Sequence, residues 1–228
     1  MVKGIKLFAL IVLLLSTGQC FAQVRFGLKA GLNLANIMDK DDNATYSSNY
    51  KYKTGFHFGV TAEFPVSKVF SIEPGLLYSQ KGFLKPVSAS AFDGLALSSA
   101  EIKATFSYLE IPVNAVYKID LRGTKFLISG GPFLGYALSA KLKATEAVLG
   151  DNSDQKEFTL NIGNKESDDL KPLDYGLNLG TGVEINDLTF GIQYGLSLAN
   201  IAPVNDQGWK IKNKVLGFSV GYKFGSKK

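Results

Sequence analysis

The chain has 228 residues and a formal net charge of +5, with 24 glycines, 16 phenylalanines and 10 tyrosines. This length allows one large β domain or two smaller ones. The charge is small and scattered along the chain, which argues against a nucleic-acid-binding protein. One histidine and one cysteine are too few for a zinc cluster, so we expect neither a metal nor another cofactor.

The first 22 residues have the pattern of a secretory signal peptide. Two lysines precede an apolar run from Leu7 to Leu15, and Cys20 and Ala22 are small residues at the positions that signal peptidase reads. The apolar run is too short to cross a bilayer as a helix. We therefore predict that residues 1–22 are cleaved and that residues 23–228 form a single barrel domain.

Attachment of a lipid to Cys20 is the less favoured alternative, because Gln19 is bulky where such sites require a small residue. Once residues 1–22 are removed, no cysteine remains in the chain. The mature protein is therefore expected to have neither disulfide nor thiolate chemistry.

Eight segments of the remaining chain alternate apolar with small or polar residues at a period of two. This period is typical of β-strands with two different faces. In the first segment, for example, Phe26 and Leu28 alternate with Gly27 and Lys29. In chain order the predicted strands are Val24–Leu34, Gly55–Phe64, Phe70–Lys81, Phe106–Tyr117, Lys125–Ala140, Asp174–Ile185, Leu188–Ser197 and Lys214–Phe224.

The connections between these segments alternate between long and short. The long connections are polar and comprise residues 39–53, 82–103, 141–171 and 200–213. The short connections carry turn residues and comprise residues 65–68, 120–123 and 186–187. Transmembrane barrels have short periplasmic turns and long extracellular loops, and their strands need about ten residues to cross the membrane. The pattern predicts an all-β fold, an eight-stranded antiparallel up-and-down transmembrane β-barrel.

The composition of the second stripe indicates which face meets lipid. It consists mainly of Gly, Ser, Thr and Asn, with few charges. An eight-stranded barrel is only wide enough for side chains to fill, so small residues suit its interior. The apolar stripe is then expected to face lipid, with Tyr117, Tyr136 and Tyr222 near the strand ends as interface residues. The alternative is a soluble lipocalin-like barrel with the apolar stripe inside, binding an apolar ligand.

Three prolines fall inside predicted strands, where each removes a hydrogen-bond donor from the ladder. They are Pro74, Pro112 and Pro132. A closed barrel has no free edge to accommodate them. We expect each to mark a β-bulge or the frayed end of a strand.

Four motifs give the chain a resemblance to a known family. They are Gly27–Asn33 (GLKAGLN), Tyr108–Pro112 (YLEIP), Gly130–Gly135 (GGPFLG) and Gly221–Phe224 (GYKF). With the signal peptide, these resemble the PorT-like outer-membrane β-barrel family, which has the eight-stranded architecture of the OmpA and OmpX type. The resemblance covers essentially the whole mature chain. It implies a cell outer membrane location in a Gram-negative bacterium, with outer-membrane lipid around the barrel.

The last strand also resembles the signal that the barrel-assembly machinery reads, so that machinery is an expected partner during insertion. Tyr222 and Phe224 occupy its aromatic positions. The chain departs from the pattern with Ser219 in place of glycine and with residues 225–228 after the last aromatic.

The interior stripe is predicted to carry a set of charged side chains of both signs. These are Arg25, Lys29, Glu63, Glu73, Lys81, Glu110, Asp174, Glu184 and Lys223. Charges away from water must be paired, so we favour a structural network that fills the lumen over an ion or proton path. His57, on the same stripe, has no serine and acid at triad spacing, and we predict no catalytic residue.

The long loops are the expected interaction surface, because loops on a rigid scaffold often carry function. Tyr46, Tyr50, Tyr52 and Trp209 are candidates for contacting a surface protein or glycan, and packing of loop on loop is an equal alternative. We predict a non-enzymatic outer-membrane protein with a structural or loop-mediated binding role and no nucleic-acid partner. A narrow channel for small solutes is the second hypothesis.

Overall fold

The structure, a computed structural model, describes residues 24–88, 99–147, 154–204 and 208–225. The predicted signal peptide lies outside these residues. Nine β-strands and one short 3-10 helix, η2, make up the described chain. Their bounds are β1 Arg25–Lys40, η2 Ser47–Asn49, β2 Lys53–Pro65, β3 Phe70–Ser88, β4 Ser99–Leu121, β5 Thr124–Ala147, β6 Asp154–Thr159, β7 Leu173–Ile185, β8 Leu188–Ser197 and β9 Lys210–Phe224.

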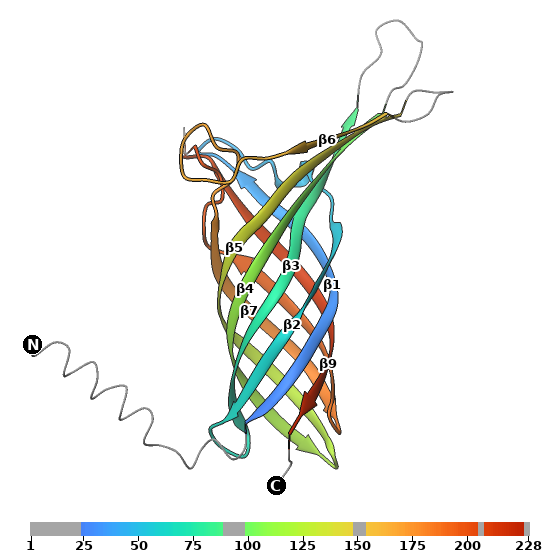
Figure 1. The fold of residues 1–228 in the computed structure, drawn as a ribbon, viewed down its shortest axis with the longest axis vertical. Coiled ribbons are helices and arrows are strands. Elements are labelled where there is room, and N and C mark those ends of the chain that lie inside the picture. Colours follow the sequence, from blue (N-terminus) through green and yellow to red (C-terminus); the bar gives the residue numbers. More distant parts are fainter. Residues whose placement is uncertain (1–23, 89–98, 148–153, 205–207, 226–228) are drawn as a thin grey trace, which may run out of the picture.

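Eight of the strands form a closed antiparallel ring in the order β1, β2, β3, β4, β5, β7, β8 and β9 (Figure 1). The last strand closes the ring on the first, from Phe26 opposite Phe224 to Lys40 opposite Lys210. Every ring neighbour is antiparallel and follows in sequence once β6 is set aside. The predicted eight-stranded up-and-down barrel is confirmed. Among the described residues, no helix is long and apolar enough to cross a membrane.

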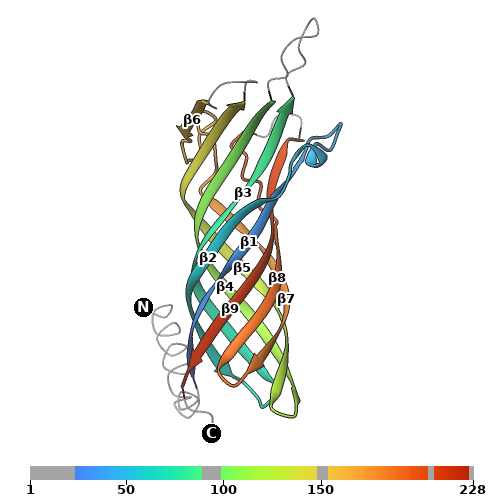
Figure 2. The same ribbon diagram turned by 90° about the vertical axis from the view of Figure 1, so that its right-hand side faces the viewer.

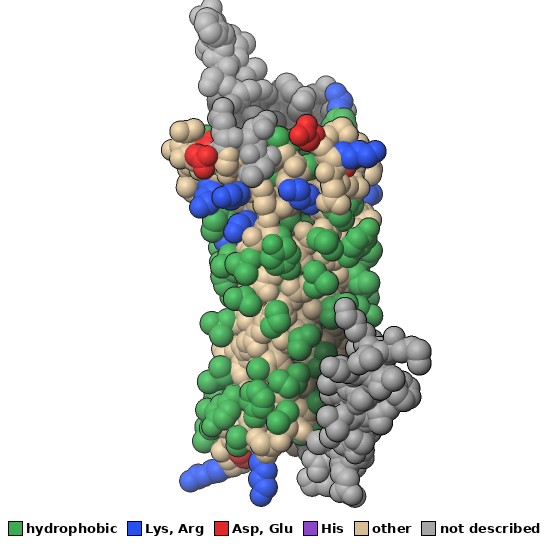
Figure 3. Space-filling view, turned by 90° about the vertical axis from the view of Figure 1, so that its left-hand side faces the viewer, with side chains coloured by type: hydrophobic (Ala, Val, Ile, Leu, Met, Phe, Trp, Pro, Cys, Tyr) green, Lys and Arg blue, Asp and Glu red, His purple; other side chains and the backbone are tan. Residues whose placement is uncertain are grey.

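The apolar stripe faces outward along the whole ring. Phe26, Leu28 and Leu32 of β1 are 64%, 54% and 57% exposed, whereas Asn33 is buried inside. The space-filling view shows apolar side chains covering the wall between two ends that carry charged side chains (Figure 3). A soluble lipocalin-like cup requires the opposite arrangement, so that alternative is wrong for this chain.

Small residues in the inner stripe allow the strands to pack closely around a narrow lumen. A Cβ atom added to Gly31 would lie 1.9 Å from the carbonyl oxygen of Phe218 and 2.6 Å from Cε1 of His57. One added to Gly59 would lie 2.1 Å from the carbonyl oxygen of Leu76. Glycine at these positions therefore leaves room for the backbone and for the large polar side chains of neighbouring strands.

Strands β3, β4 and β5 are much longer than predicted. They continue beyond the barrel wall as a projecting sheet, to which β6 adds a fourth strand (Figures 1 and 2). We call this sheet the flap; it comprises residues 82–88, 99–106, 139–147 and 154–159. Parts of the predicted loops 82–103 and 141–171 are therefore strand.

The physical reason is that the period of two continues past the predicted strand ends. A cluster of inward-facing apolar side chains, the loop-end core, packs here against the connections beyond β6 and β8. Its buried members are Ala104, Phe106, Tyr108, Ala137, Ala140, Leu170 and Ile201. The ladder is thus stabilised by burial as well as by hydrogen bonds.

The three prolines do not mark bulges, so that expectation is wrong. Pro74 keeps its partner Val113 on β4, Pro112 keeps Phe133 on β5, and Pro132 keeps Leu177 on β7, all without a register shift. Each proline instead has no register partner on its other neighbouring strand. Proline has no N–H to donate, so the hydrogen-bond ladder is interrupted on that side while the strand itself continues.

The bulge lies elsewhere, at the loop end. Ser107 pairs with Ser139 and Tyr108 with Ala137, so Leu138 is the extra residue. A bulge increases local twist and changes the direction of a strand. The bulge lies where the flap begins, so it can change the direction of the strand between the barrel wall and the flap.

Candidate functional site

The lumen contains two clusters of ion pairs. The first, the turn-end cluster, lies near the short turns and consists of Arg25, Glu63, Glu73, Lys118, Lys125, Glu184, Asp187 and Lys223. The residues of this cluster comprise four cationic and four anionic side chains. Charge balance is what removal from water requires.

Glu63 of β2 lies at the centre of the turn-end cluster. Lys118 donates to one of its carboxylate oxygens, and Lys223 Nζ lies 2.5 Å from the other. Lys223 also lies 2.8 Å from Glu73, and Arg25 Nη1 lies 2.8 Å from Glu184. The strands on both sides of the β1–β9 closure are thus tied to each other across the lumen.

The second cluster, the loop-end cluster, is built around Lys81 of β3. Its Nζ lies 2.5 Å from Glu110 Oε1 and 2.9 Å from Asp174 Oδ2, and Asp174 is fully buried. Asn213 donates to the same Asp174 oxygen over 2.9 Å. Lys81 Nζ also lies 4.4 Å from the centre of the Phe133 ring, a cation–π distance.

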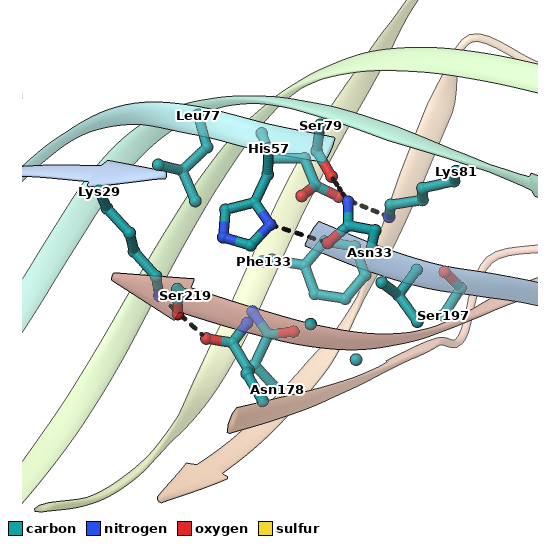
Figure 4. A pocket seen from close by; sticks show the side chains of 15 residues that line it. Lys29, Asn33, His57, Leu77, Ser79, Lys81, Phe133, Asn178, Ser197 and Ser219 are labelled. Atoms are coloured by element: carbon teal, nitrogen blue, oxygen red, sulfur yellow. Dashed lines mark hydrogen bonds and ion pairs between the residues drawn. The ribbon is translucent and has the colours of Figure 1, made fainter. Parts of the chain in front are cut away.

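Between the clusters lies a small polar cavity with a volume of about 40 Å³ (Figure 4). Nδ1 of His57 lies 2.8 Å from Oδ1 of Asn33, whose amide nitrogen donates to Ser79 over 3.1 Å. Nε2 of His57 is buried without a protein partner. A polar cavity of this size has room for water, which can hydrogen-bond such a nitrogen.

Lys29 forms no close ion pair in either cluster, and it interacts with Glu73 and Glu110 only through longer-range electrostatics. Its side chain lines the small polar cavity (Figure 4) and donates to Gln193 Oε1 over 3.4 Å. Within the described chain no carboxylate lies within 4.0 Å of its ammonium group. Lys29 lies at a different height along the lumen from the carboxylates, which pair with the cations of the two clusters. The other eight predicted lumen residues all take part in ion pairs.

Three members of the turn-end cluster were not predicted from the sequence, namely Lys118, Lys125 and Asp187. A signal for Lys118 exists, since it continues the inward period of Glu110 and Asn114. It was missed because β4 runs on past the predicted end at Tyr117. Asp187 lies in a turn, where period-two reasoning does not apply.

The pair formed by His57 and Asn33 joins an imidazole to an amide. The group beside His57 is an amide rather than a carboxylate, so the pair lacks the charged orienting group of a nucleophile–base system. In the described part of the chain, no group of three or more His, Cys, Asp or Glu residues could hold a metal ion. The buried charges are instead arranged to satisfy one another.

At the loop end, Asp39 joins the first and last long loops. Its carboxylate accepts hydrogen bonds from the Tyr50 hydroxyl over 2.6 Å and from Trp209 Nε1 over 2.8 Å. Burial, followed by the hydrogen bond to Asp39, raises the pKa of Tyr50. The Tyr50 ring also packs edge-on against Phe83 at 4.8 Å. Tyr50 and Trp209 therefore pack loop on loop.

The other two loop tyrosines lie open to solvent. Tyr46 is 39% exposed and Tyr52 is 59% exposed. Tyr46 donates to Asp41 over 3.1 Å on the same loop. Of the four predicted loop candidates, these two have accessible rings.

Asp39, which organises the pair Tyr50 and Trp209, was not predicted, because nothing in the sequence relates it to a residue 170 positions away.

Comparison with known proteins agrees with the strand topology. Residues 21–202 match the family model described as outer membrane protein beta-barrel domain. No curated protein matches the chain.

Solved structures to which the chain is similar include two bacterial proteins. One is Ail, the attachment invasion locus protein of Yersinia pestis in complex with the heparin analogue sucrose octasulfate, at 15% identity over 89% of this chain and 99% of Ail, with a TM-score of 0.39. Another is Neisserial surface protein A, at 16% identity over 87% of this chain and 97% of that protein, with a TM-score of 0.37. Both scores are low, so the fold assignment depends on the strand register and the family match.

Proposed function

We propose that the barrel of this chain is a closed scaffold and that its flap and loops bind a partner at the cell surface. The premise is that the chain belongs to the family of outer membrane protein β-barrel domains. The single observation that carries this proposal is the lumen. Two ion-pair clusters and the loop-end core fill it, leaving cavities of about 40 and 70 Å³. A lumen filled by its own side chains favours a scaffold over a solute path.

The flap supplies the binding surface. Among the described strands β6 pairs only with β5, so one edge of β6 presents free backbone hydrogen-bonding groups. A free edge can accept an extended segment of another protein as an additional strand. Phe158 of β6 is 54% exposed, and Tyr52 lies open on a neighbouring loop. We infer a protein partner that contacts the flap and a non-enzymatic role for the chain.

Cross-linking in intact cells tests the flap. A photoreactive phenylalanine analogue is placed at Phe158, and a matched control analogue at Leu179, which is 67% exposed on the outer wall of the barrel. Irradiation is expected to give a discrete protein adduct from position 158 and none from position 179. Absence of any protein adduct from position 158 in cells that display the folded barrel would contradict the proposal.

A narrow channel is the second candidate function, and planar-bilayer conductance separates the two. The scaffold is expected to give no discrete conductance steps. Regular steps that disappear when Lys81 is replaced by Met would show that ions pass the loop-end cluster, and would establish the channel instead.

Three finer features belong to the same proposal. We infer that residues 1–22 are a signal peptide cleaved before Gln23, that the barrel-assembly machinery of a Gram-negative bacterium inserts the barrel, and that the chain is of the PorT-like type. The motifs at Gly27–Asn33 and Gly221–Phe224 support the last two. N-terminal sequencing of the membrane fraction is expected to begin at Gln23, and a start at Met1 would contradict cleavage.

A further inference from the structure

Exposed lysine side chains follow the apolar stripe toward the loop end of the molecule, on β4 and β5 where the barrel wall continues into the flap. On β5 the outward Leu138 is followed, past the bulge, by Lys141 and Lys143, whose side chains are 49% and 50% exposed. On β4 the outward Leu109 is followed higher up by the exposed Lys103. Figure 3 shows lysine and arginine side chains of this kind gathered between the apolar wall and the loop end of the barrel.

The β1–β9 wall repeats this arrangement. Phe218, Val220 and Tyr222 face outward on β9, and the same period of two puts Lys214, Lys212 and Lys210 on the outer face nearer the loops. Lys40 of β1 lies directly opposite Lys210. We call the two groups together the lysine rim: Lys40, Lys103, Lys141, Lys143, Lys210, Lys212 and Lys214.

Each group contains a pair of lysines placed directly opposite each other. Lys103 is the register partner of Lys143, and Lys40 is the register partner of Lys210. Like charges in directly opposed cross-strand positions destabilise a sheet. Glu157 relieves only part of this repulsion, because it pairs with Lys141 at 2.6 Å and Lys143 at 2.9 Å. In the part of the chain that the structure describes, Lys103 and Lys210 have no carboxylate within 4.0 Å.

The β4–β5 group surrounds a hollow of about 300 Å³. The hollow is lined by Lys53, Thr54, Gln80, Lys103, Thr105, Lys141, Lys143 and Glu157. Its lining combines four lysines with hydroxyl and amide donors and one carboxylate. The lysines, hydroxyls and amide are hydrogen-bond donors of the kind that bind phosphate, and Glu157 is the one carboxylate among them.

We propose that the lysine rim binds phosphate groups of outer-leaflet lipid headgroups, with the hollow beside Lys103, Lys141 and Lys143 as the principal site. The position of the rim identifies the lipid. Along each strand the lysines follow the outward apolar side chains that face the hydrocarbon, and this order places them at the level of the lipid headgroups. An anionic headgroup at that level offsets the repulsion between opposed lysines. The site uses side chains on the outer face of the flap, including Glu157 of β6, whereas the partner proposed above pairs with the backbone edge of β6.

Retention of a phosphorylated glycolipid tests the proposal. The full-length mature barrel is reconstituted with diphosphorylated lipid A, extracted in mild detergent and gel-filtered, and the lipid phosphate retained per barrel is measured. The test variant is Lys103→Gln/Lys141→Gln/Lys143→Gln. The matched control is Lys51→Gln/Lys156→Gln/Lys165→Gln, which removes the same charge from exposed positions outside the rim. Wild type and control are expected to retain the lipid, and the test variant at least about tenfold less, because each lysine at a membrane surface adds to the attraction.

Two further measurements identify the ligand. Lipid A with its phosphates removed is expected to be retained poorly and equally by all three proteins. Inorganic phosphate at the same concentration of phosphorus is expected not to displace the bound lipid. Equal retention by the test variant and wild type, an equal loss in the control, or displacement by inorganic phosphate would each overturn the proposal. Heat-dependent gel mobility verifies that each variant is folded, and Lys103→Gln alone provides the test if the triple variant does not fold.

Discussion

At the scale of single residues, the inner wall of this barrel is determined by two requirements that oppose each other. Large charged side chains must meet partners across the lumen, and the strands must approach closely enough to close the ring. Glu63 and Gly31 illustrate the two. Glu63 accepts from lysines on β4 and β9, whereas Gly31 leaves space for His57.

Replacing Glu63 by Gln should be the more damaging of two matched changes in the lumen. Glu63 is buried and pairs with both Lys118 and Lys223. Its loss leaves Lys118 without the carboxylate it pairs with, whereas Lys223 keeps Glu73, and we expect a cost of about 3–5 kcal/mol. Glu110→Gln removes a side chain that is 14% exposed, and Lys81 keeps Asp174, so we expect about 1–3 kcal/mol. Urea unfolding in detergent micelles measures both free energies. Equal losses would contradict the central place of Glu63.

Gly31→Ala should prevent the barrel from closing properly. Its new Cβ would lie 1.9 Å from a backbone oxygen, and only movement of the strands relieves that contact. The matched control is Gly191→Ala, whose Cβ would be no closer than 3.5 Å to another atom. Gel mobility without boiling is expected to show a folded form for the control and its loss for Gly31→Ala. A heat-resistant Gly31→Ala barrel would show that the wall is less tightly packed than the structure indicates.

At the scale of elements, β6 is held to β5 by a backbone ladder and by the exposed pairs of Glu157 with Lys141 and Lys143. Hydrogen bonds from Lys141 and Lys143 lower the pKa of Glu157 to about 2, from an ordinary value of 4.5. A depressed folded-state pKa means that this contribution is fully present above pH 4.5 and is lost as the pH falls through about 2. The pairs are exposed, so salt screens them.

A carboxyl NMR titration checks this directly. The Glu157 signal is expected to titrate near 2 in the wild-type protein and to return toward 4.5 in the Lys141→Gln/Lys143→Gln variant. The double variant leaves the β5–β6 backbone ladder intact, so the comparison isolates the two side-chain contacts. A midpoint near 4.5 in the wild type would mean that the lysines are directed elsewhere, for instance toward bound anions.

At the scale of the whole molecule, closure depends on β1 meeting β9 and not on β6. The ring pairs β5 with β7 directly, from Thr124 opposite Ile185 to Tyr136 opposite Leu173. Replacing residues 154–159 by a short Gly/Ser linker is therefore expected to leave a barrel that still shifts in mobility on boiling. Loss of the folded form would show instead that the flap is needed for closure.

The strand order, the direction of each strand and the face that meets lipid could all be predicted from the sequence. A strand with alternating side chains can place either of its two stripes toward the lumen. Only the stripe with residues as small as Gly27 and Gly31 fits a narrow lumen. The same period identified eight residues that the structure brings into ion pairs. These are consequences of local geometry, and a single chain suffices to read them.

Tertiary structure alone decided which side chains meet. Period-two reasoning places Lys29 and Lys81 on the same inner face, yet only Lys81 reaches carboxylates, because height along the lumen depends on strand stagger. The same stagger brings Trp209 to Asp39 and sets Lys103 opposite Lys143. The sequence by itself determined the barrel and its lipid-facing wall. The register between strands, which depends on closing the ring and on the bulge at Leu138, determined the contacts on which its proposed functions depend.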